Sequence, residues 1–235
     1  PRCIQLAWQL HDFSGKLIEI KNYIIYPEGF SIPEDVVKIH RINTERAKKE
    51  GHSLSFVLQE FSLTLDKCKY IIGHNVLFDV KVVFSEYFRE NKIYEIEKFQ
   101  NRTLSIKKNK SEWLALDTCN EESAQHCKLP GGWNGGFKFP KLVELYNYLF
   151  GSLFDGAHDA SVDVAATARC FLELLRLNVI NVDQIFSKEE KVFFFKSNTA
   201  IISPFKPIPN IISKQDNVDL SELKIKNIKD FIEHK

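Results

Sequence analysis

Two short stretches near the start of the chain alternate apolar and polar side chains. Residues 3–10 do so with a period of two, which predicts a strand with one buried face, and residues 17–26 read as its hairpin partner. Residues 12–15 supply the turn between them. Further along, a short apolar run at 70–73 ends in glycine, and 114–118 has the character of a strand edge.

Helical spacing of apolar residues marks the segments between these strands. The spacing predicts helices at 33–40, 53–66 and 79–90, a helix with Pro140 in its first turn, and a last helix at 160–177. Residues 130–136 form a glycine-rich loop. Strands followed by alternating strands and helices indicate an α/β domain whose mixed sheet is flanked by helices.

The character of the chain changes after residue 177. Residues 1–177 are expected to form one domain, and residues 178–235 a C-terminal appendage with a lysine-rich end. In the appendage, the phenylalanines at 193–195 read either as a buried strand or as a docking surface. An amphipathic helix is expected at 220–234.

The composition is that of an ordinary globular protein, with 44% hydrophobic and 27% charged residues. The formal net charge is +1, so any nucleic-acid binding must come from a local groove and not from a global basic field. No apolar run approaches the roughly 20 residues that cross a bilayer, so we expect no membrane contact and a cytoplasmic location. The five scattered cysteines favour free thiols over a disulfide or zinc framework.

Two polar segments carry the candidate chemistry. Residues 73–79, G-H-N-V-L-F-D, lie where an apolar strand ends and a helix begins, and residues 158–163, H-D-A-S-V-D, lie at the start of the last helix. Taken alone, Asp79 has the position of a helix cap, and His158 that of a capping or core histidine. The occurrence of both segments in one chain favours a shared site.

In these segments the chain resembles the DEDDh 3′–5′ exonucleases, the family of the epsilon proofreading subunit of DNA polymerase III, RNase T and oligoribonuclease. The family's second motif is similar to residues 73–79 (G-H-N-x-x-F-D), and its third to residues 158–163 (H-D-A-x-x-D). A weaker element, I-H-G-I-T followed by an acid, is matched at 39–45, with Arg41 in place of the glycine. The resemblance covers residues 1–177 and implies an RNase H-like fold.

The resemblance also implies a two-metal phosphodiester hydrolase. Two divalent cations, Mg²⁺ or Mn²⁺, would stabilise the attacking and leaving oxygens, and carboxylates are the ligands that such hard cations prefer. By resemblance, Asp79 and Asp163 are two of four metal-binding acids. His158 is then the general base that takes a proton from the attacking water.

The family's first motif, D-x-E on the first strand, does not occur in this sequence. Its nearest imitation, Glu95 and Glu97, follows the second motif and reads as a solvated charge pair. In the family this strand pairs with a segment like residues 3–10, so it is expected upstream of Pro1. The lack of any methionine, even at position 1, agrees with missing residues. The alternative is a degenerate, inactive protein.

The expected function is removal of nucleotides from a nucleic-acid 3′ end, with DNA preferred, in proofreading or repair. The matched motifs assign His40, Asn75 and Phe78 to binding a single-stranded or frayed 3′ end, and a replicative polymerase is a candidate partner. One alternative is a ribonuclease that trims RNA 3′ ends. Another is a catalytically inactive module that binds nucleic acid or a polymerase.

Two further groups of residues leave alternatives open. Trp133, Phe137 and Phe139, beside the glycine-rich loop, read either as base-stacking side chains or as packing residues. The lysines between 107 and 110 read either as phosphate contacts or as a solvated face.

Overall fold

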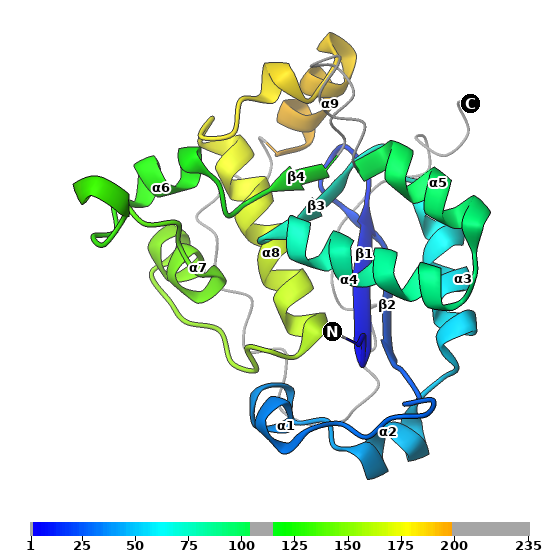
Figure 1. Cartoon of the computed structure of the whole chain (residues 1–235). Helices are drawn as coiled ribbons and strands as arrows, with labels where there is room; N and C mark the ends of the chain where they lie inside the picture. The colour runs from blue at the N-terminus through cyan, green and yellow to red at the C-terminus, as the bar shows by residue number, and fades with distance from the viewer. Residues whose placement is uncertain (1, 104–114, 199–235) are drawn as a thin grey trace.

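Helices and short strands make up the parts of the chain that the computed structural model describes, residues 2–103 and 115–198 (Figure 1). The strands are β1 (Gln5–His11), β2 (Leu17–Ile24), β3 (Ile71–Gly73) and β4 (Ala115–Asp117). The α-helices are α1 (Glu34–His40), α2 (Thr44–Glu50), α3 (Leu54–Leu65), α4 (Val76–Arg89), α5 (Ile93–Thr103), α6 (Glu121–Cys127), α7 (Leu142–Phe150), α8 (Ala160–Arg176) and α9 (Lys188–Asn198). Short 3-10 turns occur at η1 (Trp133–Gly135) and η2 (Val182–Gln184).

The strands form two pairs that differ in direction. β1 and β2 are antiparallel, with Gln5 opposite Ile24, whereas β3 and β4 are parallel, with Gly73 opposite Asp117. Within the described residues no hydrogen-bonded ladder joins one pair to the other. Both strand directions of the expected mixed sheet are therefore present, in two separate pairs.

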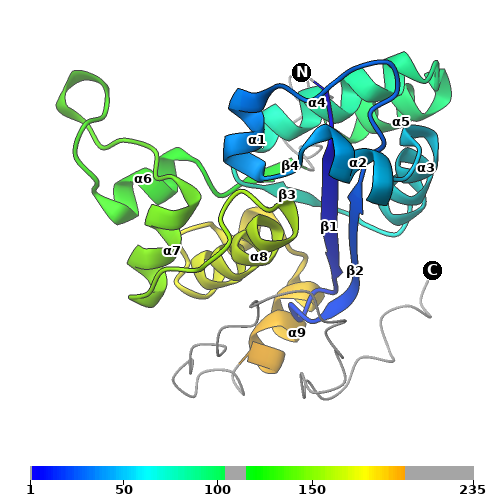
Figure 2. The ribbon, with the colours of Figure 1, turned by 90° about the horizontal axis from the view of Figure 1, so that it is seen from below.

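Helices cover the strands from two sides. α8 packs against β1, β2 and β3, and α7 packs on α8, while α4 contacts β3 and β4. Figure 2 shows α7 and α8 on one side of β1 and β2, with α3, α4 and α5 on the other. One apolar cluster around Trp8, Val80 and Tyr87 joins β1 to α3 and α4, and a second around Leu145 and Leu174 joins α7 to α8.

Residues beyond 177 add to the second cluster. Among the described residues from 178 to 198, the side chains buried in it are those of Ile180, Val182, Ile185 and Phe194. The Tyr70 hydroxyl donates to the Ile185 carbonyl, and Lys69 forms an ion pair with Glu190 at 2.9 Å. The phenylalanines at 193–195 lie in α9, so their interpretation as a strand is wrong. The helical turn buries Phe194 and leaves Phe195 exposed.

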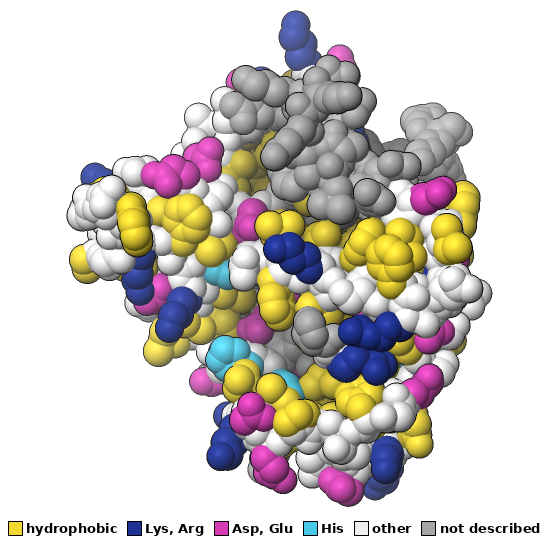
Figure 3. All heavy atoms as spheres, in the orientation of Figure 1, with side chains coloured by type: hydrophobic (Ala, Val, Ile, Leu, Met, Phe, Trp, Pro, Cys, Tyr) yellow, Lys and Arg dark blue, Asp and Glu magenta, His cyan; other side chains and the backbone are white. Residues whose placement is uncertain are grey.

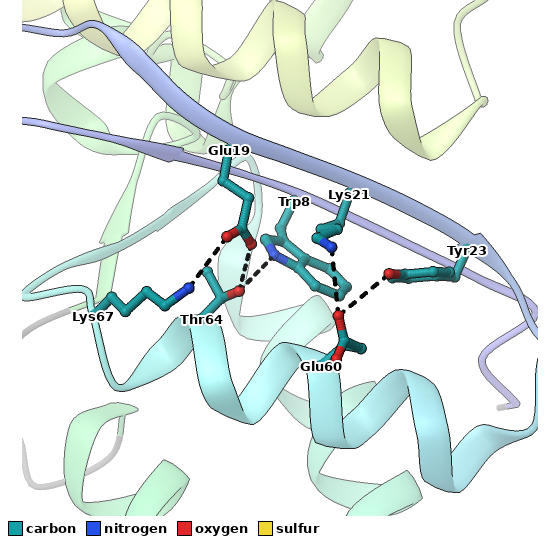
Figure 4. Close-up of polar contacts among 7 residues, drawn as sticks. All are labelled: Trp8, Glu19, Lys21, Tyr23, Glu60, Thr64 and Lys67. Carbon is teal, nitrogen blue, oxygen red and sulfur yellow. Dashed lines mark hydrogen bonds and ion pairs between the residues drawn. The ribbon is translucent and has the colours of Figure 1, made fainter. Parts of the chain in front are cut away.

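A polar network ties the β1–β2 hairpin to α3 (Figure 4). The Thr64 hydroxyl donates to the Glu19 carboxylate at 2.7 Å and accepts the Trp8 indole N–H at 3.2 Å. Lys21 and Glu60 make a second link, at 3.4 Å. A buried indole needs a partner for its N–H, and Thr64 supplies one.

Most of the expected elements are confirmed. The four expected strands are present as β1 to β4, and α1, α3, α4 and α8 lie at the expected helices, although α4 begins earlier, at Val76. Pro140 lies before α7 and not in its first turn. Lys141 is the N-cap of that helix, and its N–H donates to the Glu144 carboxylate at 2.8 Å.

The predicted helices omit α2, α5 and α6. α2 and α6 contain few apolar residues, so neither shows an apolar period, whereas the buried Ile96 and Phe99 of α5 lie three residues apart and were a usable signal. The N-cap residues of α2 and α6 were also a usable signal, because the side chain of Asn43 accepts the Arg46 N–H and that of Asn120 accepts the Ser123 N–H, each at 2.8 Å. Cap residues would have located both helices.

Three other expectations concern the chain as a whole. All five cysteines are free thiols, as expected. No helix within residues 2–103 and 115–198 is long and apolar enough to span a membrane. The helix expected at 220–234 and the lysines between 107 and 110 lie outside the described residues.

Replacing Thr64 by valine keeps the side-chain shape and removes the hydroxyl. We expect Thr64→Val to lower the free energy of unfolding by about 1–2 kcal/mol, because Glu19 loses a donor and the Trp8 N–H loses an acceptor. Thr64→Ser keeps the hydroxyl and should lose less. Urea unfolding of the three proteins measures this, and a Thr64→Val protein as stable as wild type would contradict the role of the network.

Candidate active site

The turn between β3 and α4 carries the G-H-N-x-x-F-D motif. β3 ends at Gly73, where an added Cβ would lie 2.8 Å from the Cβ of Val76, so the turn has no room for a side chain. Asn75 has φ 62°, the left-handed region that asparagine tolerates better than most residues. α4 then begins at Val76 and carries Asp79 in its first turn.

The Asp117 carboxylate, at the end of β4, holds this turn. Its Oδ1 accepts the N–H groups of Asn75 and Cys119, each at 2.8 Å, and its Oδ2 accepts the Val76 N–H at 3.1 Å. The first N–H groups of a helix have no acceptor within the helix, so an acceptor from β4 stabilises the start of α4. Asp117 therefore positions the first turn of α4, and Asp79 with it.

His74 makes a second link between the same two strand ends. Its Nδ1 lies 2.9 Å from the Thr118 hydroxyl, and the Thr118 N–H donates to the Gly73 carbonyl at 2.9 Å. Burial lowers the pKa of His74, although the charge of Asp117 and the Pro140 carbonyl oppose this shift. The ring is thus a bridge within the motif and connects β3, β4 and the loop before α7.

His158, Asp159 and Asp163 lie together at the start of α8. Asp159 is the N-cap, and its Oδ1 accepts the Ser161 N–H at 2.9 Å and the Ser161 hydroxyl at 2.6 Å. The Asp163 carboxylate accepts the His158 N–H at 3.2 and 3.3 Å. This bond helps to hold the exposed His158 at φ 76°, a conformation that costs free energy. His158 and Asp163 are therefore fixed in one turn, as the spacing predicted.

The two motifs meet electrostatically at Asp79. The surrounding protein removes water from the Asp79 carboxyl group, and this desolvation, followed by the charges of Asp117 and Asp163, raises the pKa of Asp79 to about 6. Asp79 nevertheless keeps an exposed surface, so the residue remains open to solvent. Figure 3 shows acidic and histidine side chains around a hollow beside the N-terminal end of α8.

Asp79 and Asp163 have the chemistry of a partial divalent-metal site. Burial also raises the pKa of Asp163, and the His158 N–H opposes this only in part. A cation between the two would offset their repulsion, and Mg²⁺ and Mn²⁺ prefer carboxylate oxygens. Within the described ranges no group of three or more His, Cys, Asp or Glu side chains is placed to hold an ion. The pair fits a divalent cation as part of a larger set of ligands.

The three expected substrate-binding residues lie in two places. Asn75 and Phe78 belong to the same turn as Asp79, and both are exposed, with 59% of Phe78 accessible. His40 lies at the end of α1, where its Nδ1 accepts the Ile42 N–H at 3.1 Å. Burial lowers the pKa of His40. Asn75 and Phe78 thus border Asp79, whereas His40 uses one ring nitrogen to shape its own turn.

Sequence reasoning missed Asp117. The segment at 114–118 reads as a strand edge, and nothing in that reading distinguishes its aspartate from a solvated one. The available signal was an acid directly after a short apolar strand, since parallel strands end at the same edge of a sheet. Pairing of Gly73 with Asp117 places this acid beside the second motif.

A family model described as "Exonuclease", of the RNase T type, matches residues 11–171. The chain belongs to the exonuclease family. The match spans both motifs, and it confirms the resemblance to the 3′–5′ exonucleases of the DEDD group and the RNase H-like fold. No curated protein sequence matches the chain.

Solved structures of Exonuclease I from E. coli share the fold. In the complex with a 5cy-dT13 oligonucleotide, Exonuclease I is 20% identical in sequence to this chain, with a TM-score of 0.56. The match covers 75% of this chain and 37% of the Exonuclease I chain. Its complex with a dT13 oligonucleotide is 21% identical with a TM-score of 0.56, covering 75% and 38%. The chain therefore spans little more than a third of the length of Exonuclease I.

Asp117→Asn should affect both the turn and the charge at Asp79. An amide has one acceptor oxygen, and its NH₂ group would face a backbone N–H, so we expect a loss of about 1–3 kcal/mol in the free energy of unfolding. We also expect the pKa of Asp79 to fall, because a neighbouring negative charge is removed. NMR titration of the Asp79 carboxyl carbon measures the second effect. Asp35→Asn, in the first turn of α1, is the control for net charge. An unchanged Asp79 titration in Asp117→Asn would contradict the coupling.

Proposed function

We propose that this member of the exonuclease family is a 3′–5′ exonuclease that hydrolyses phosphodiester bonds at nucleic-acid 3′ ends. The proposal rests on the positions of Asp79 and Asp163 in the first turns of two separate helices, with the charge of Asp163 acting on Asp79, and on His158, which is held in the same turn as Asp163. Like charges are brought together at a cost, and a site for divalent cations gives that cost a function.

Each residue takes a definite role in the proposed reaction. Asp79 and Asp163 hold Mg²⁺ or Mn²⁺, which when bound stabilises negative charge on the attacking and leaving oxygens. The exposed His158 ring takes a proton from the attacking water. Asn75 and Phe78, exposed on the turn that carries Asp79, contact the terminal nucleotide. His40, at the end of α1, binds the substrate from another side.

DNA is the preferred substrate, in proofreading or repair. The Exonuclease I structures that share this fold are complexes with dT13 and dA16 oligonucleotides, which supports single-stranded DNA as the ligand class to test first. An RNA oligomer of the same length and sequence is the direct comparison. Faster release of nucleotides from the RNA would replace DNA by RNA in the proposal.

We further propose that a D-x-E strand outside this sequence contributes two more acids. Asp79 and Asp163 are two of the four acids that a DEDD site uses, and the described residues offer no group of three ligands. In the part of the chain that the structure describes, no ladder joins β1 to β3, although α8 packs against both. A strand that paired with both would join the two strand pairs and would place its side chains beside α8.

The natural full-length protein should release mononucleotides from the 3′ end of a 5′-labelled single-stranded oligomer in Mg²⁺ or Mn²⁺. EDTA should stop the reaction, because the cations stabilise the developing charges. Residues 1–235 alone, which lack the D-x-E pair, should be inactive in the same assay. Gel analysis of the labelled products measures both. Internal cleavage, activity in EDTA or full activity of residues 1–235 would contradict the proposal.

His158 and Asp163 should separate proton transfer from metal binding. We expect His158→Ala to lower turnover by about 10²- to 10⁴-fold with Mn²⁺ affinity retained, because its ring moves a proton and holds no ion. Asp163→Asn should lower both turnover and Mn²⁺ affinity. Initial rates and isothermal titration with Mn²⁺ measure the two quantities.

The matched control is His126→Ala, which removes a histidine of α6 that packs edge-on against Tyr148 of α7. Its turnover should stay close to that of wild type. If His158→Ala also retained a near-normal rate, His158 would not be the general base.

A further inference from the structure

Gln5, on β1, is bonded to the start of α8 through both ends of its side-chain amide. Its Oε1 accepts the Ala160 N–H at 3.2 Å, and its Nε2 donates to the Asp159 carboxylate at 3.3 Å. The same Nε2 also donates to the Asn22 side chain of β2 at 3.0 Å. Two hydrogens and one oxygen of a single amide are thus engaged.

The chemistry of this contact suits a helix start. Ala160 is the first residue of α8, and its N–H has no acceptor within the helix, so the Gln5 oxygen supplies one. Asp159 is the N-cap, and as a carboxylate it only accepts hydrogen bonds, so the Gln5 NH₂ complements it. These partners allow one orientation of the amide, because a flipped amide would face Ala160 with a donor and Asp159 with an acceptor.

The contact lies one step from the candidate catalytic turn. Asp159 follows His158 directly, and the Asp159 carbonyl accepts the Asp163 N–H at 3.0 Å. The Asp163 carboxylate in turn accepts the His158 N–H. A displacement of Asp159 or Ala160 relative to β1 would therefore move His158 and Asp163 as well.

Apolar packing does not duplicate this link. Ala166 and Cys170 are buried in the body of α8 and Val162 is buried in its first turn, but burial of apolar area is not directional. The orientation of the first turn of α8 relative to the strands depends on directional hydrogen bonds. Gln5, on β1, makes such bonds to Asp159 and Ala160.

We propose that Gln5 is a positioning residue, whose amide sets where His158 and Asp163 lie relative to the strands. The proposal rests on the exonuclease function proposed above and assigns no contact between Gln5 and substrate. A small displacement of catalytic groups from their reactive positions lowers turnover. It changes KM little when most contacts with the substrate are made by other residues. Loss of Gln5 should therefore affect kcat more than KM.

The test compares Gln5→Met, which keeps the length and removes all three bonds, with Gln9→Met on the same face of β1. Gln9 contacts the His11 ring at 3.0 Å. In the natural full-length protein we expect Gln5→Met to lower kcat by about 10- to 100-fold with KM near wild type. The Ala160 amide should also exchange its hydrogen faster, while amides in the middle of α4 keep their protection. Gln9→Met should change neither.

Gln5→Glu keeps the acceptor for Ala160 but loses both donors and turns a second carboxylate toward Asp159, so its turnover should fall at least as far as that of Gln5→Met. If Gln5→Met kept wild-type turnover, the proposal would be overturned. It would also be overturned if both methionine variants lost the same turnover and amide exchange became faster throughout the protein. If wild type itself released no nucleotides, the proposed function would fail. The Gln5 proposal would then be decided by Ala160 exchange and by Mn²⁺ affinity, which should weaken in Gln5→Met and not in Gln9→Met.

Discussion

Packing of one helix, α8, against both strand pairs is the constraint on which the rest of the structure depends. Within the described residues no ladder joins β1 to β3, so the relative position of the two pairs depends on the helices that contact both, above all on α8, with α4 on the other side. The buried face of that helix runs through Val162, Ala166 and Leu174. Both groups of candidate catalytic residues begin at this interface, one on α8 itself and one at the end of β3.

Apolar burial brings these elements together, but hydrogen bonds at helix starts decide where the acids lie. Asp117 accepts two N–H groups at the entry of α4, and Gln5 and Asp159 act on the first N–H groups of α8. In each case a side chain outside the helix, either its own N-cap or a residue of a neighbouring strand, satisfies donors that the helix cannot satisfy internally. The same device thus positions Asp79 and Asp163, and it explains why both acids lie in first turns of helices.

Concentrated negative charge makes this region costly for the fold. Crowding and neighbouring carboxylates raise the pKa of Asp79 to about 6, so folding favours its neutral form, and the ionised form weakens the fold as the pH rises through that value. A divalent cation would reverse this preference by favouring the ionised carboxylates. Functional sites commonly trade stability for activity in this way. The left-handed backbone conformation of His158 is a second cost in stability at this site, and the hydrogen bond from its N–H to the Asp163 carboxylate helps to hold it.

The sequence by itself determined most of the strands and helices, and its two motifs located the candidate residues Asp79, His158 and Asp163, because spacing within one motif is visible in the chain. It could not reveal Asp117 or Gln5, because their roles depend on which strands lie side by side and on which helix end each strand faces. The short helices α2 and α6 were lost for a different reason, since their signal is a cap residue and not a period. Only the tertiary structure decided these points, because hydrogen bonds between segments distant in sequence leave no periodic trace in the chain.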